Sequence, residues 1–277
     1  SGYRAGFKWW ALIIAVVFVI SETVCVLCVP ERPVKTDGGS TGILDMFKAL
    51  IHNDQAMTVV ASVILVYTSI NICGNLILYF FKFDVGNEGA YSVFAAVVFA
   101  AQVLVMMIVP ALRRKFTKFE LFIFGFIIQI AGFAMMLLLA VSGIYTPDNW
   151  YVFCLPGCMV YIGYGILNVI MTIFLSDSVD YGEVKNGTRE ESVIFSMQTF
   201  TVKLASGLAI FLAGIIVDVI KLDKNAIVQS QSTLNGLRMW MTIPSVILLI
   251  IGIIIFKKFY KLNEQKMNEI KTKLNRN

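Results

Sequence analysis

Seven long apolar runs constrain this chain more than any other feature of its sequence. Each run is long enough to cross a bilayer as an α-helix, which takes about 20 residues, and none alternates like a membrane β-strand. Only 15% of the 277 residues are charged, against about 25% in soluble domains. We therefore predict an all-α membrane protein with seven transmembrane helices, at residues 9–29, 56–81, 91–112, 121–145, 150–175, 192–220 and 239–256.

The basic residues predict how these helices are oriented. If the helices alternate in direction, 16 of the 23 Lys and Arg residues lie on one side of the membrane and six lie on the other. The positive-inside rule makes the richer side cytoplasmic, with the amino terminus outside and the carboxyl terminus inside. The net charge of +5 then reflects topology and not a nucleic-acid partner. We predict a transmembrane helix in residues 1–30, a cytoplasmic loop at 31–55, a six-helix bundle at 56–256 and a basic cytoplasmic tail at 257–277.

Catalytic and metal-binding residues are not expected. His52 is the single histidine, and Cys25 and Cys28 lack the second pair that would complete a zinc site. We find no phosphate-binding loop or hydrolytic constellation at usable spacing. The chain is therefore expected to be neither an enzyme nor a cofactor-binding protein.

Polar side chains inside the sixth run point to a cavity within the membrane. Lys203 lies roughly 16 Å along this helix, close to the bilayer centre, where a charge is costly. Residues at steps of three and four place one polar stripe on a single helix face, and Gln198 widens it; the stripe consists of Ser192, Ser196, Thr199, Lys203 and Ser206. The ammonium group either faces an aqueous cavity or is neutralised by a partner inside the bundle. We favour the cavity.

The second and fifth runs carry further polar residues near their centres. Asn71 and Asn75 share a face of the second run, and Tyr164 and Asn168 lie in the glycine-loosened fifth run. Without the first helix, the remaining six divide into two triplets, each led by such a helix. Matching interruptions in repeated triplets are typical of a transporter's binding site at the membrane midplane. Simple hydrogen bonding between helices is the alternative.

A charged segment at residues 176–192 carries a family resemblance. Its carboxylates and basic groups can exchange ion pairs when helices rock; they include Asp177, Asp180, Glu183, Lys185, Arg189 and Glu191. The run Asp-Tyr-Gly-Glu from Asp180, followed by Gln198, Thr199 and Lys203, resembles the glycoside–pentoside–hexuronide cation symporters of the melibiose permease type. These carriers are a branch of the major facilitator superfamily. The resemblance covers nearly the whole chain, as helices six to twelve of a twelve-helix carrier.

The resemblance implies sugar or glycoside uptake coupled to Na⁺, H⁺ or Li⁺ in the plasma membrane of a bacterial-type cell. By position, Lys203 and Thr199 match residues near the sugar and cation sites, and Arg189 and Glu191 match a cytoplasmic gate. Asn168 stands where the melibiose type has a tryptophan, so the sugar stays open. The family's cation-binding carboxylates lie on earlier helices, so we expect a partner amino-terminal half and no transport by this chain alone. The alternative is a complete seven-helix receptor or sensor with an extracellular amino terminus.

Overall fold

The computed structural model describes residues 2–28, 51–187, 191–226 and 228–274. The chain divides into two units, residues 1–41 and 42–277. In the first, the described residues form the helix α1 (Gly2–Cys28), whose described side chains are exposed. Seven helices in the described residues are long and apolar enough to cross a membrane. The prediction of an all-α protein with seven transmembrane helices is thereby confirmed.

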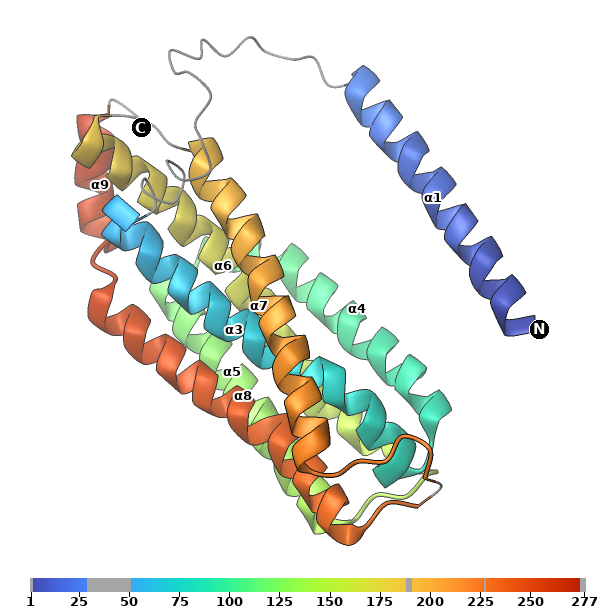
Figure 1. Cartoon of the computed structure of the whole chain (residues 1–277). Coiled ribbons are helices and arrows are strands. Elements are labelled where there is room, and N and C mark those ends of the chain that lie inside the picture. Colours follow the sequence, from blue (N-terminus) through green and yellow to red (C-terminus); the bar gives the residue numbers. More distant parts are fainter. Residues whose placement is uncertain (1, 29–50, 188–190, 227, 275–277) are drawn as a thin grey trace. The chain divides into compact units, whose positions relative to one another are not determined.

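In its described residues, the second unit is a bundle of six long helices with one short helix at its end (Figure 1). A short π-helical segment, η1 (Phe80–Val85), extends the first of the six, and a 3-10 turn, η2 (Trp150–Phe153), precedes the fourth. The long helices are α3 (Asp54–Tyr79), α4 (Glu88–Leu112), α5 (Lys118–Ser142), α6 (Cys154–Asn186), α7 (Glu191–Val219) and α8 (Gln231–Phe259), and the short one is α9 (Glu264–Lys273).

Polar residues at the helix ends set where these helices begin and stop. The side chain of Asn53 accepts a hydrogen bond from the third backbone N–H of its helix, and Asn87 and Ser230 do the same for α4 and α8. Thr117 and Glu120 form a reciprocal capping box at the start of α5. Gly143 ends α5 in the left-handed conformation, which glycine adopts without strain.

The pattern of contacts between helices stays the same when the two triplets, α3 to α5 and α6 to α8, are exchanged. The leading helix α3 packs against α7 and α8 of the other triplet, while the leading helix α6 packs against α4 and α5. The two leading helices also touch each other, as do α5 and α8. Asn53, at the start of α3, donates a hydrogen bond to the carbonyl of Ser178 near the end of α6, so these two helices run in opposite directions. The repeat is therefore inverted. This is the predicted three-plus-three bundle.

Small residues bring α5 and α6 into close contact. A Cβ atom added to Gly132 would lie 2.7 Å from the backbone nitrogen of Val160, and one added to Gly163 would lie 2.6 Å from the carbonyl oxygen of Gly125. Neither helix could carry larger side chains at these positions at the present separation. Aromatic rings from α5, α6 and α8 fill the core beside this contact.

Three predicted helix ends are wrong. The first helix begins at Gly2, seven residues before its predicted start. The fifth predicted helix stopped at residue 175, whereas α6 continues to Asn186, so the first eleven residues of the predicted charged loop are helical. Ser178 is buried and donates to the Phe174 carbonyl within this extension. The last long helix also begins at Gln231, eight residues before the predicted start, which places Pro244 near its middle instead of near its start.

Candidate functional site

A line of hydrogen bonds joins the centres of α3 and α6 to the first third of α7. The amide nitrogen of Asn168 on α6 donates to the hydroxyl oxygen of Tyr67 on α3 over 2.6 Å. Thr172, one turn further along α6, donates to the backbone carbonyl of Asn168 over 3.0 Å and accepts from the Gln198 amide of α7 over 3.4 Å. We call Tyr67, Asn168, Thr172 and Gln198 the polar bridge. It links the leading helices of both triplets at mid-depth.

Other predicted residues flank the polar bridge. The ring of Tyr164 meets that of Tyr67 edge-on, with 5.4 Å between ring centres. Asn71 donates its side-chain amide to the Tyr67 carbonyl and Asn75 donates to the Asn71 carbonyl, each over 2.7 Å. Both side-chain nitrogens thus donate within their own helix. The side-chain oxygens of Asn71 and Asn75 can accept hydrogen bonds from a ligand.

Lys203 lies on an exposed face of α7 that is divided into two strips. Phe200, Leu204, Phe211 and Ile215 form an apolar strip that suits lipid. Beside it is an exposed polar strip, opposite the face that packs on α3, formed by Ser192, Ser196, Thr199 and Lys203. Lipid would leave an ammonium group without hydrogen-bond acceptors, so the polar strip requires water or protein against it. None of the ion pairs formed between described residues includes Lys203.

Asp177 is part of a buried ion pair at the end of the bundle where α6 finishes. Its carboxylate accepts a hydrogen bond from the Lys118 ammonium of α5, and the two side chains are 13% and 4% exposed. The ammonium also lies 5.4 Å from the ring centre of Phe174. Burial and the nearby Asp177 carboxylate raise the pKa of Tyr260, which keeps its hydroxyl neutral. The ion pair between Asp177 and Lys118 links α6 to α5 in this conformation.

The other predicted gate residues are less completely described. Asp180, Glu183 and Glu191 each have a hydrogen-bonding or electrostatic partner, and Arg189 lies outside the described residues. A neighbouring cluster joins the ends of α3 and α6. In it, the Lys185 ammonium lies 2.7 Å from the Asp54 carboxylate, which also accepts from the Tyr181 hydroxyl over 3.1 Å.

Sequence reasoning missed the partners of the predicted residues. Tyr67 and Thr172 belong to the polar bridge, and Lys118 and Asp54 pair with Asp177 and Lys185. In the sequence, Lys118 is the last of four basic residues between residues 113 and 118, and nothing else distinguishes it. Its pairing was not visible because it depends on how α5 lies against α6. The roles of all these residues in transport stay predictions.

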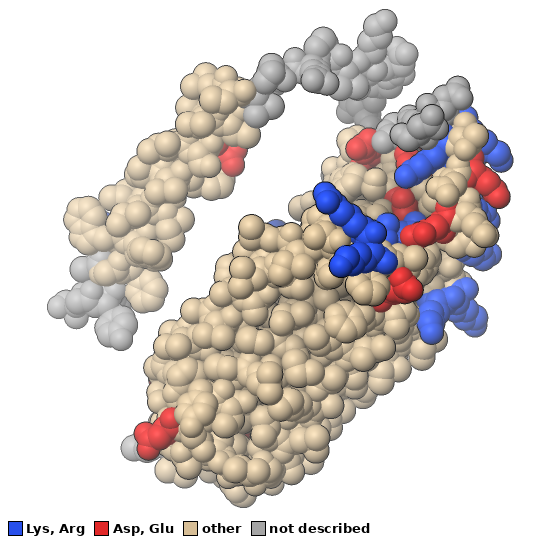
Figure 2. Space-filling model, turned by 180° about the vertical axis from the view of Figure 1, so that it is seen from behind, with Lys and Arg blue, Asp and Glu red and all other residues tan. Residues whose placement is uncertain are grey.

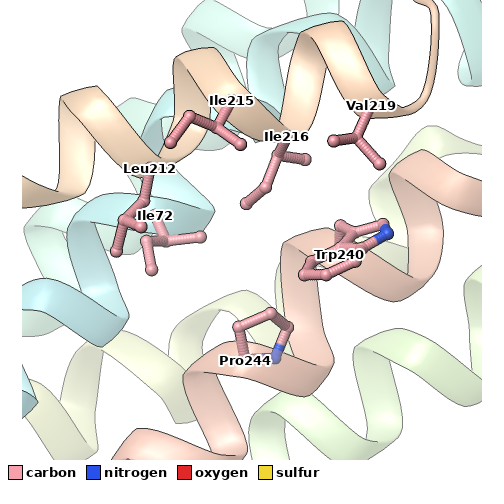
Figure 3. Close-up of a pocket in the computed structure, with 7 residues that line it drawn as sticks. All are labelled: Ile72, Leu212, Ile215, Ile216, Val219, Trp240 and Pro244. Carbon is pink, nitrogen blue, oxygen red and sulfur yellow. The ribbon is translucent and has the colours of Figure 1, made fainter.

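A separate cavity of about 140 Å³ lies between α3, α7 and α8 (Figure 3). Its side chains are apolar apart from the indole N–H of Trp240, and they are Ile72, Leu212, Ile215, Ile216, Val219, Trp240 and Pro244. A sugar needs several hydrogen-bond donors and acceptors, so this cavity is not a sugar site.

Comparison with known proteins decides the family. A family model described as MFS/sugar transport protein matches residues 2–264. The chain belongs to this family. The predicted membership of the major facilitator superfamily, within its glycoside symporters, is confirmed by this match and by carriers among the relatives. A member of this family is a multi-pass membrane protein, and its relatives are named as transporters and not as enzymes.

Three curated relatives of this sugar-transport-family chain are bacterial proteins. An uncharacterized symporter, YjmB, of Bacillus subtilis is 30% identical over 80% of this chain and 47% of its own length. A putative sulfoquinovose importer of Salmonella typhimurium is 27% identical over 94% and 54%. A raffinose carrier protein of Pediococcus pentosaceus is 25% identical over 100% and 43%. The chain thus spans about half the length of these relatives.

Proposed function

We propose that this chain forms the carboxyl-terminal portion of a secondary transporter that imports a sugar or glycoside together with Na⁺ or H⁺ by alternating access. The polar bridge is the observation that carries the proposal. It brings hydroxyl and amide groups at the centres of α3 and α6 together with an amide in the first third of α7, beside the polar strip of α7. Such groups match the alternating hydroxyls of a sugar, and named sugar carriers among the relatives support this substrate class.

In this proposal, the Lys203 ammonium group faces the water-filled space between the two halves of the carrier. The amino-terminal half supplies the carboxylates that bind the coupling cation, as the family resemblance implies. A fixed ammonium group beside those carboxylates stays charged and balances or competes with the cation. Coupling then depends on Lys203 more strongly than folding does.

The test is the substitution Lys203→Ala in the complete carrier, followed by sugar uptake with and without a Na⁺ or proton gradient. A panel of galactosides, xylosides and glucuronides first identifies the transported sugar. We expect gradient-driven uptake to fall at least tenfold while the amount of carrier in the membrane stays unchanged. Lys203→Arg, which keeps the charge, should retain part of the uptake. The matched control, Lys224→Ala, removes an exposed lysine from a loop and should transport normally. Normal uptake by Lys203→Ala would refute the proposed role.

The proposed location is the plasma membrane of a bacterial-type cell, with the carboxyl terminus in the cytoplasm and residue 1 outside. The bias of Lys and Arg supports this orientation. A receptor or sensor is the competing function, and it would require a ligand pocket completed within these seven helices. The family match and the twofold greater length of the relatives favour the carrier.

A further inference from the structure

Cationic side chains gather at one end of the bundle, while the long wall leading to that end shows few charges in this view (Figure 2). Two tripeptides at this end share one pattern: two basic residues followed by an exposed phenylalanine. One is Arg114, Lys115 and Phe116 in the turn between α4 and α5, and the other is Lys257, Lys258 and Phe259 at the end of α8. We call these six residues the basic rim.

Contacts place the two tripeptides on neighbouring segments. The ring of Phe119, in the first turn of α5, lies 6.3 Å from the Phe256 ring of α8 and 6.0 Å from the Tyr260 ring that follows it. Arg113 reaches from the turn toward Glu264 of α9, with 3.7 Å between charged atoms. The start of α5 and the end of α8 therefore lie side by side.

The pattern of buried and exposed residues indicates that the side chains of the basic rim point away from the core. Phe256 and Tyr260 point inward and stack on each other, with ring centres 4.5 Å apart. The three residues between them must then occupy the outward arc of the helix, and all three are exposed. The rings of Phe116 and Phe259 are 48% and 51% exposed, which is unfavourable for phenylalanine in water.

The cations of the basic rim are not neutralised within the described part of the chain. No ion pair between described residues includes Arg114, Lys115, Lys257 or Lys258. The acidic groups on the same segments are already engaged: the capping box of α5 holds the carboxylate of Glu120, and Glu264 faces Arg113.

An apolar stripe leads along the helix to each cationic pair. On α8, Ile247, Ile251 and Ile254 are exposed and share one face with Lys258. The distance from Ile247 to Lys258 along the helix is about 16 Å, close to the roughly 15 Å of one leaflet of hydrocarbon. On α4, Leu104, Ile108 and Ala111 lead in the same way to Lys115, because helical hydrogen bonds continue through this turn to Phe116.

We propose that the basic rim binds the phosphate headgroup of an anionic phospholipid whose acyl chains lie along these apolar stripes. The lysine and arginine groups contact the phosphate, and the two phenylalanine rings lie at the boundary between headgroups and acyl chains. This proposal depends on the membrane-spanning bundle and not on the transported substrate.

The test is native mass spectrometry of the full chain, released from micelles that hold equal amounts of phosphatidylglycerol and phosphatidylcholine with identical acyl chains. We expect the chain to retain phosphatidylglycerol preferentially. The pair Lys257→Gln and Lys258→Gln should lower the ratio of retained phosphatidylglycerol to phosphatidylcholine at least fivefold, since each charge contributes about a fivefold preference. The pair Arg114→Gln and Lys115→Gln should act in the same direction.

The matched control removes two charges from the same end of the bundle, at Lys266 and Lys273 on α9. Its lipid ratio should stay within twofold of the original chain. Circular dichroism and gel filtration check that each variant is folded. An equal loss of preference in the control, a chain without any preference, or displacement of the lipid by millimolar glycerol 1-phosphate would each overturn the proposal.

Discussion

The hydroxyl of Tyr67 on α3 is held by a hydrogen bond from another helix. It accepts a hydrogen bond from Asn168, which lies 101 residues further along the chain on the other leading helix. The Asn168 amide nitrogen is the donor of this bond, so the side-chain oxygen of Asn168 can accept a hydrogen bond from a ligand. The Tyr164 hydroxyl also interacts with both side chains, so the group joins three polar side chains of α3 and α6.

Removing the Tyr67 hydroxyl should weaken the bundle by a small and measurable amount. Tyr67→Phe deletes the acceptor for Asn168 and keeps the ring that packs on Tyr164. Hydrogen bonds between membrane helices contribute about 0.6–1.7 kcal/mol, and we expect a loss of this size in the free energy of unfolding, measured by titration with SDS. Tyr161→Phe is the control, since Tyr161 makes no hydrogen bond to a described residue. A double-mutant cycle with Asn168→Ala that gave no coupling energy would contradict this interpretation.

The buried pair of Lys118 and Asp177 should be far more sensitive to substitution. Lys118→Met would leave the Asp177 carboxylate buried without its cation, which typically costs about 3–5 kcal/mol. Replacing both residues, as Lys118→Met with Asp177→Leu, should recover most of the loss, because no buried charge then remains. Thermal unfolding in detergent measures both variants. A stable single variant would show that the carboxylate finds another partner.

At the scale of whole helices, the close contact of α5 and α6 explains why these helices carry several glycines. Gly132 and Gly163 lie where an added carbon would meet the backbone or side chain of the other helix at less than 3 Å. The glycines of α7 differ in this respect: Gly207 and Gly214 have no atom within 4 Å of the added carbon. Glycine therefore permits the close approach of two helices in the first case, whereas in the second a larger side chain would have room.

This difference predicts opposite effects of the same substitution. Gly132→Ala should destabilise the bundle by about 1–3 kcal/mol, because α5 and α6 would have to move apart. Gly207→Ala should leave stability unchanged or raise it by up to about 1 kcal/mol, because alanine favours the helix. The free energy of unfolding measured side by side for the two variants checks both statements. Equal effects at the two positions would show that the contact between α5 and α6 is looser than described.

The sequence predicted the existence of the helices better than their ends. An apolar run marks the part of a helix inside hydrocarbon, so the polar extension of α6 from residue 176 to Asn186 looked like a loop. Likewise, the stripe containing Lys203 followed from spacing within one helix. The partners Tyr67 and Lys118 could not be predicted from spacing, because their contacts depend on the packing of separate helices.

At the scale of the whole molecule, we expect this chain to be unable to transport alone. The polar strip of α7 is exposed on the bundle, and in the proposed carrier the opposing half contributes the cation-binding carboxylates. Vesicles reconstituted with only these 277 residues should therefore show no sugar accumulation driven by a Na⁺ or proton gradient. Vesicles containing the complete carrier provide the positive control. Accumulation by the 277-residue chain would mean that one half contains a full coupling mechanism.

The exchanged contacts of the two triplets have a consequence for synthesis at the ribosome. The residues that cover α3 belong to α7 and α8, which leave the translocation machinery last. Before that, the polar residues of α3 lie in the bilayer without all the helices that cover them in the folded bundle; they include Tyr67, Asn71 and Asn75. The first triplet therefore reaches its native packing only after the second has been inserted. An insertion chaperone that shields the newly inserted α3 would shorten the period in which these polar groups are exposed to lipid.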